Sequence, residues 1–218
     1  MRIVSLVICM LLSSCSIMRS PSMPQLLPVA EQAQEPCERF FVSGNWQFVH
    51  SIHFEQSSGH GITLVGITVL EGTKLKTVLM GVEGFVLFEA EQNASGQVLV
   101  IRAMPPFDRT GFAEGLMADV RALFVEPEYS KRIIAKNQKG ERVCRYTSGK
   151  DRITDVVTAS QGWNRIEQYD GNGILQKAIT AEKYREVAGA SIPEDIVLTA
   201  LGARAYTLEL QLLSADKI

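Results

Sequence analysis

Residues 59–104 carry the clearest structural pattern of the chain, and they read GHGITLVGITVLEGTKLKTVLMGVEGFVLFEAEQNASGQVLVIRAM. Glycine recurs in this stretch every 12 or 13 residues, at Gly59, Gly72, Gly84 and Gly96. Runs rich in Val, Ile, Leu, Phe and Thr lie between the glycines, and regular turn signals at this spacing are typical of hairpins in an antiparallel sheet. The predicted strands are Ile62–Leu70, Leu75–Val82, Phe85–Ala90 and Val98–Met104.

Further strands are predicted on both sides of this stretch. In Val42–Glu55, one face carries Trp46, Phe48, Ile52 and Phe54, with His50 as a polar exception, and the other face is mostly polar. Turn residues divide the second half of the chain into seven more candidate strands. These are Arg132–Asn137, Glu141–Thr147, Ile153–Ala159, Asn164–Tyr169, Leu175–Tyr184, Asp195–Ala200 and Ala205–Leu213. The chain therefore has ten to twelve predicted strands.

The run Ile62–Leu70 is apolar on both faces. Such a strand is either covered on both sides by a two-layer core or lines a dry cavity. The pattern favours the two-layer core, but it is also the first indication of a binding function.

One helix is predicted over Thr110–Val125, capped by Asp108 or Thr110 and closed by Pro127. Its apolar residues repeat at helical spacing, with Asp119 and Arg121 expected on the outer side. Because a sheet of this many strands must curl, we expect a mainly β fold with a helix (α+β). The expected architecture is a strongly curved antiparallel sheet, an incomplete β-barrel, with the helix packed into its concave side.

The first residues predict an export signal. Arg2 is followed by a short apolar run from Ile3 to Leu12, which is the pattern of a secretory signal peptide. Leu12-Ser13-Ser14-Cys15 fits the lipobox of bacterial lipoproteins, in which the cysteine becomes the lipidated N-terminus. The alternative is an ordinary secreted protein with an incidental Cys15.

In the lipoprotein interpretation, two or three fatty acyl chains, palmitate among them, anchor the protein to a membrane. Ser16 in place of Asp favours the outer membrane, with the protein facing the periplasm. The predicted organisation is a signal peptide over 1–14, a lipidated flexible tether over 15–35 and one folded domain over 36–218. Ala30 to Gln34 could form a short helical turn within the tether.

Two cysteines remain in the predicted mature domain, Cys37 and Cys144. In an oxidising periplasm they are expected to form a disulfide that ties the start of the domain to its second half. The alternative, a reactive or metal-binding cysteine, has no neighbouring partner motif.

The composition excludes several functional classes. The chain has 22 basic and 24 acidic residues, so a strongly basic nucleic-acid binder is not expected. His50 and His53 point to opposite faces of one strand, and no metal site or cofactor is predicted. Asp151 and Asp155 are expected to solvate a strand edge, and no catalytic group is assigned. We therefore expect a protein that is not an enzyme.

The central and later segments resemble a family of bacterial outer-membrane lipoproteins that is itself similar to the lipoprotein carriers LolA and LolB. The matching segments are Leu79-Met80-Gly81, Phe85–Phe88, Met104–Phe107, Leu116–Val120, Glu126-Pro127, Gly162-Trp163, Arg165-Ile166, Ile179 and Tyr184. The resemblance implies an incomplete barrel with a helical lid over an apolar cavity that holds acyl chains. It implies a monomer that carries or accepts a lipid or lipoprotein without catalysis.

The expected wall of this lipid-binding cavity consists of apolar residues that could equally be plain core. They are Trp46, Phe48, Ile52, Leu64, Leu79, Leu99, Ile101, Leu116, Val120, Leu208 and Leu210. The alternative function is a non-catalytic assembly accessory of the envelope that uses the same fold as a protein-binding platform. An enzyme acting on lipids or glycans is the third hypothesis, and it lacks a polar cluster in the sequence.

Overall fold

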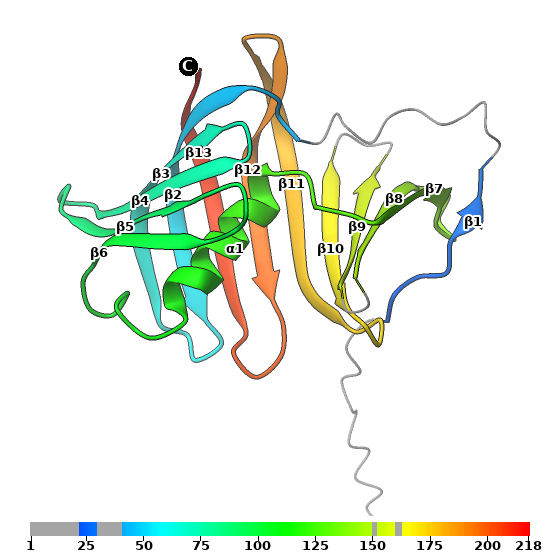
Figure 1. Cartoon of the computed structure of the whole chain (residues 1–218), viewed down its shortest axis with the longest axis horizontal. Helices are drawn as coiled ribbons and strands as arrows, with labels where there is room; N and C mark the ends of the chain where they lie inside the picture. Colours follow the sequence, from blue (N-terminus) through cyan, green and yellow to red (C-terminus); the bar gives the residue numbers. More distant parts are fainter. Residues whose placement is uncertain (1–21, 30–40, 150–151, 160–162) are drawn as a thin grey trace, which may run out of the picture.

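The computed structural model describes residues 22–29, 41–149, 152–159 and 163–218, which form one antiparallel sheet and the helix α1 (Figure 1). The first strands are β1 (Leu27–Pro28), β2 (Asn45–Gln56), β3 (Gly61–Glu71), β4 (Lys74–Gly81), β5 (Val86–Gln92) and β6 (Val98–Ala103). After α1 (Phe112–Phe124) come β7 (Lys131–Lys136), β8 (Arg142–Ser148), β9 (Arg152–Thr158), β10 (Asn164–Asp170), β11 (Leu175–Val187), β12 (Ala190–Ala200) and β13 (Tyr206–Lys217).

The sheet is continuous and stays open. Its order is β1-β7-β8-β9-β10-β11-β12-β13-β2-β3-β4-β5-β6, so β13 pairs with β2 in the middle and β1 and β6 form the two edges. The sheet bends strongly, and α1 lies within the bend, with its backbone beside β4, β5 and β6 (Figure 1). The predictions of a mainly β fold, one helix and a curved antiparallel sheet without closure are therefore confirmed.

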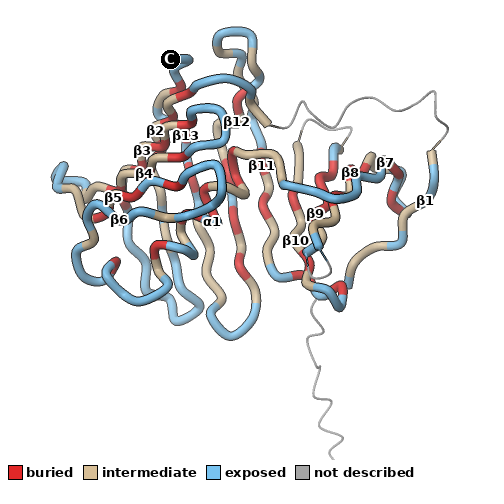
Figure 2. Tube along the Cα trace, in the orientation of Figure 1, coloured by how far each residue is buried: buried red, intermediate tan, exposed pale blue. Residues whose placement is uncertain are grey.

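The strand register brings apolar residues from distant parts of the chain onto the concave face. Directly paired residues of an antiparallel sheet share a face, so successive pairs make a row across several strands. One row is Cys144, Val156, Ile166, Ile179, Leu198, Leu208 and Phe54. Buried positions alternate with less buried ones along β2, β3 and β4 (Figure 2). The core thus lies between the concave face and α1.

Three local features differ from the sequence predictions. The N-cap of α1 is Gly111, in the left-handed region at φ 77°, instead of Asp108 or Thr110, and no side chain caps the helix. The hairpin of β11 and β12 extends to Val187 and Ala190, beyond the predicted limits. Charged residues at the end of β11 and Pro193 within β12 concealed this extension, because proline argues against an interior strand.

The third difference concerns residues 22–29, part of the predicted tether. They lie on the sheet, where β1 pairs with β7 and the Met23 N–H donates to the Gly173 carbonyl at 2.8 Å. A two-residue strand that contains a proline has too little pattern to be predicted.

Several predictions concern residues outside the described ranges, namely Cys15, Ala30–Gln34, Cys37 and Asp151. The lipidation of Cys15, the helical turn, the Cys37–Cys144 disulfide and the domain boundary therefore stay predictions. Cys144 is buried in β8.

Across the described ranges, no helix is both long and apolar enough to cross a membrane.

Candidate functional site

The apolar face of α1 packs against the concave face of the sheet. The Phe124 ring stacks on Phe48 of β2, with ring centroids 4.9 Å apart and planes 11° apart. At the other end of the helix, Phe112 packs edge-on against Phe88 of β5 at 5.8 Å. Met117 is completely buried between these aromatic contacts. Stacked and edge-on pairs both add to the stabilisation from burial, so α1 has a defined position on the sheet.

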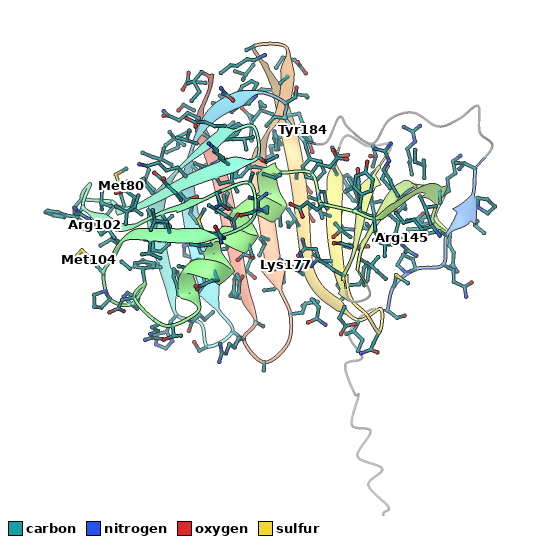
Figure 3. The ribbon with its side chains drawn as sticks, in the orientation of Figure 1. Met80, Arg102, Met104, Arg145, Lys177 and Tyr184 are labelled. Atoms are coloured by element: carbon teal, nitrogen blue, oxygen red, sulfur yellow. The ribbon has the colours of Figure 1, made fainter. Side chains whose placement is uncertain are left out.

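A buried carboxylate fastens the same helix to β11 and β13. Asp119 is 3% exposed, and its two oxygens accept hydrogen bonds from the Lys177 ammonium and the Tyr206 hydroxyl. Burial and the neighbouring Asp119 charge raise the pKa of Tyr206 above its usual value, so the phenol stays protonated and can donate. Figure 3 shows Lys177 beside α1. The expectation that Asp119 faces outward was wrong, because cationic and hydroxyl partners on the sheet compensate its burial.

A second polar contact fastens α1 to the opposite part of the sheet. The Arg121 Nε donates to the Gln92 side-chain oxygen at 2.7 Å. The Arg121 Nη2 donates to the carbonyls of Thr73 and Asn93, each at 3.1 Å. Thr73 lies in the turn between β3 and β4, and Asn93 follows β5. Asp119 and Arg121 thus connect α1 to both arms of the bent sheet.

Nine of the eleven predicted wall residues meet in one apolar cluster with α1. Six of them are buried in this cluster: Trp46, Phe48, Leu64, Leu79, Val120 and Leu210. The other three are half-buried and pack against it: Ile52, Leu116 and Leu208. In this conformation the nine side chains are packed as core. Their use as a lipid-binding wall therefore requires α1 to move.

The other two predicted wall residues were placed incorrectly. Leu99 and Ile101 on β6 are 64% and 50% exposed. Leu99 pairs with Glu91 in the outward-facing row that also contains Lys76 and Val69. Ile101 is the extra residue at a register irregularity opposite Glu89 and Ala90, so it drops out of the β5–β6 pairing.

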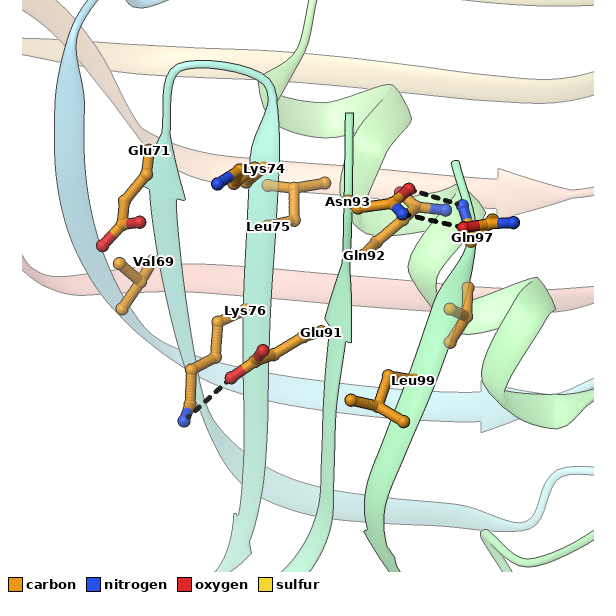
Figure 4. A pocket seen from close by; sticks show the side chains of 11 residues that line it. Val69, Glu71, Lys74, Leu75, Lys76, Glu91, Gln92, Asn93, Gln97 and Leu99 are labelled. Carbon is orange, nitrogen blue, oxygen red and sulfur yellow. Dashed lines mark hydrogen bonds and ion pairs between the residues drawn. The ribbon is translucent and has the colours of Figure 1, made fainter. Parts of the chain in front are cut away.

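Two open cavities lie at the surface, and Leu99 is the one predicted wall residue that lines either of them. One, of about 670 Å³, is at the ends of β3 to β6, where Lys76 is paired with Glu91 beside Leu99 (Figure 4). The other, of about 570 Å³, lies between Phe41–Ser43, Gly72–Thr73 and Val125–Tyr129, at the C-terminal end of α1. The first has a mixed charged and apolar lining, which does not match an acyl chain.

A buried ion pair stands on the convex side of the sheet. Arg145 of β8 donates two hydrogen bonds of 2.7 Å to the carboxylate of Asp155 on β9, which is completely buried. The Arg145 Nη2 also donates to the Pro24 carbonyl at 3.0 Å. Burial raises the pKa of Asp155, and Arg145 opposes this effect. The prediction that Asp155 solvates a strand edge was wrong, because residues 22–29 cover this part of the convex face.

The three histidine side chains do not form a cluster. His50 is 2% exposed beside the stacked rings of Phe48 and Phe124, and burial lowers its pKa to about 4. His53 and His60 are exposed. Within the described ranges, no three His, Cys, Asp or Glu side chains are placed as a metal ion requires.

No family model matches this chain, and no curated protein matches it. Among solved structures, it is similar to a LolA superfamily protein from Nitrosomonas europaea, with 16% identity over 83% of this chain and 89% of that one and a TM-score of 0.49. A domain from Vibrio parahaemolyticus named for outer membrane lipoprotein sorting has 15% identity over 79% of this chain and 85% of that one, with a TM-score of 0.46. A DUF1329 family protein from Desulfovibrio piger has 12% identity over 81% and 86%, with a TM-score of 0.43.

Proposed function

We propose that this chain is a non-catalytic envelope lipoprotein that binds an acyl chain of a lipid or lipoprotein between α1 and the concave face of the sheet. The observation that carries the proposal is the arrangement of α1. The helix α1 covers the apolar face of an open, curved sheet, and its two polar attachments lie on opposite arms of that sheet.

The closed arrangement can open at moderate cost. A buried ion pair contributes little net stability, because the attraction between its charges is offset by their lost hydration. When α1 moves out, Asp119 and Lys177 regain water, and the main loss is apolar contact. An acyl chain replaces that contact at about 0.8 kcal/mol for each buried methylene group. Binding therefore needs no catalytic group. It depends on whether the sheet gains more free energy from contact with the acyl chain than from contact with α1.

The anchoring of the protein is part of the same proposal. Lipidated Cys15 would hold the chain at the outer membrane, facing the periplasm and acting as a monomer carrier or acceptor. A Cys37–Cys144 disulfide would tie residue 37 to β8, whose Cys144 is buried. Residues 22–29 lie on the sheet, so only residues 16–21 would separate the lipid from the folded part.

Native mass spectrometry of the chain carrying Cys15→Ala tests the proposal. We expect co-purified lipid, and uptake of a hydrophobic fluorophore that fatty acid displaces. Asp119→Asn weakens the fastening of α1 and should increase the rate of uptake. Glu114→Gln, on the exposed side of the same helix, is the control and should leave the rate unchanged. Absence of both lipid and uptake in all three proteins would favour the alternative of an assembly accessory.

A further inference from the structure

The two edge strands of the sheet differ in how far they are protected from pairing with another strand. At one edge, β1 covers β7 and presents Pro28, which lacks a backbone N–H. At the other edge, β6 is the last strand, and no described segment pairs with its outer side. Exposed edges are usually protected because their unpaired backbone groups can bind another strand. The open β6 edge is therefore a candidate interaction surface.

Exposed apolar side chains gather at this edge. Leu99, Val100 and Ile101 of β6 are 64%, 44% and 50% exposed. Met104 follows β6 directly, and its N–H donates to the Leu87 carbonyl of β5 at 2.9 Å. Figure 3 shows Met80, Arg102 and Met104 together at this end of the molecule. Adjacent exposed apolar side chains on an unpaired edge are the usual features of a strand-binding site.

Arg102 supplies a charge at the same edge. Its direct neighbour on β5 is Glu89, but the Glu89 carboxylate is already bound by Lys76, with 2.9 Å between Nζ and Oε1. In the described part of the chain, no ion pair joins Arg102 to a carboxylate. A strand added outside β6 could place an acidic side chain next to Arg102.

We propose that the β6 edge binds an extended segment of a partner protein, which adds antiparallel to β6 as a fourteenth strand. The segment is apolar at alternate positions and carries a carboxylate that pairs with Arg102. A second copy of this chain fits less well, because β6 reads VLVIRA and offers no acidic residue to the other Arg102. This site is separate from the concave face and does not depend on acyl-chain binding.

Two labelled synthetic peptides test the proposal with the chain carrying Cys15→Ala. One is an eight-residue peptide of alternating Val and Thr with a single central Glu, and the other has Lys in place of Glu. Fluorescence anisotropy measures binding, and hydrogen exchange measures protection of the amides of residues 98–103. We expect the Glu peptide to bind about fivefold more tightly than the Lys peptide and to protect these amides.

Arg102→Glu should reverse this preference without unfolding the protein, because the side chain is exposed. Arg204→Glu, in the turn between β12 and β13, is the matched control and should leave it unchanged. Absence of binding, or protection elsewhere in the sheet, would overturn the proposal. Self-association that protects residues 98–103 without the peptide would also overturn it, and would identify a second copy as the occupant.

Discussion

His50 shows how a single residue can work against the stability of the fold. Its imidazole lies in the aromatic part of the core, with ring centroids 6.3 Å from Phe48 and 5.8 Å from Phe124. Burial disfavours the charged form and lowers the pKa to about 4 from 6.5. The histidine is therefore neutral in the folded protein at neutral pH.

We expect His50 to make the protein sensitive to mild acid. Between pH 6.5 and about 4, the unfolded chain binds a proton at this position that the folded protein does not. The free energy of unfolding should fall by about 3 kcal/mol across this range because of this residue. His50→Leu should remove that part of the pH dependence, as measured by urea unfolding at several pH values. His53→Leu alters an exposed histidine, and an equal effect there would contradict the assignment.

At the scale of elements, α1 is positioned by contacts with strands that are distant in the chain. Asp119 and Lys177 are 58 positions apart, and Asp119 and Tyr206 are 87 positions apart. The Asp119 carboxylate is desolvated on a helix that is also held by apolar packing and by the hydrogen bonds of Arg121. A buried charge of this kind is stable only while the Lys177 ammonium and the Tyr206 hydroxyl stay bound to it.

We expect Lys177→Met to lower the free energy of unfolding by about 3 kcal/mol, because it leaves Asp119 buried without its cation. The double variant Asp119→Leu/Lys177→Met removes both charges and should be more stable than Lys177→Met alone. Chemical denaturation of the wild type, both single variants and the double variant completes the cycle. Strictly additive effects would show that the two side chains do not interact.

At the scale of the whole molecule, residues 22–29 connect the N-terminal region to the convex side of the sheet. Met23 bonds to Gly173, Pro24 accepts a hydrogen bond from Arg145, and β1 pairs with β7. The Arg145–Asp155 ion pair lies beneath this segment. If Cys15 is lipidated, this attachment limits how far the folded part can move from the membrane.

We expect Arg145→Met to loosen this segment and to destabilise the sheet by about 3 kcal/mol, because Asp155 is left buried without its cation. Hydrogen exchange of residues 22–29 should become faster, and urea unfolding should shift to lower concentration. Arg152→Met changes an exposed arginine at the start of β9 and is the control. Unchanged exchange in Arg145→Met would show that Arg145 does not hold the segment.

Local pattern alone predicted most of the elements. The glycines at 59, 72, 84 and 96 all have positive φ, and the strands they separate lie within a few residues of the predicted limits. The alternation of Trp46 and Phe48 with polar neighbours also predicted which face of β2 is buried. These features depend on residues two to four positions apart, so local sequence was enough to specify the strands, most turns, the helix and their apolar faces.

Contacts between distant segments, by contrast, specify which of these faces meet and which polar groups are buried. Asp119 and Asp155 look like solvated carboxylates in the sequence, because their partners lie on other elements. Leu99 faces outward because the β5–β6 register pairs it with Glu91, and Ile101 drops out of the pairing at an irregularity that no local pattern marks. Sheet order, bending and register are set by contacts between distant segments, whose free energies depend on the whole fold and not on any one stretch of chain.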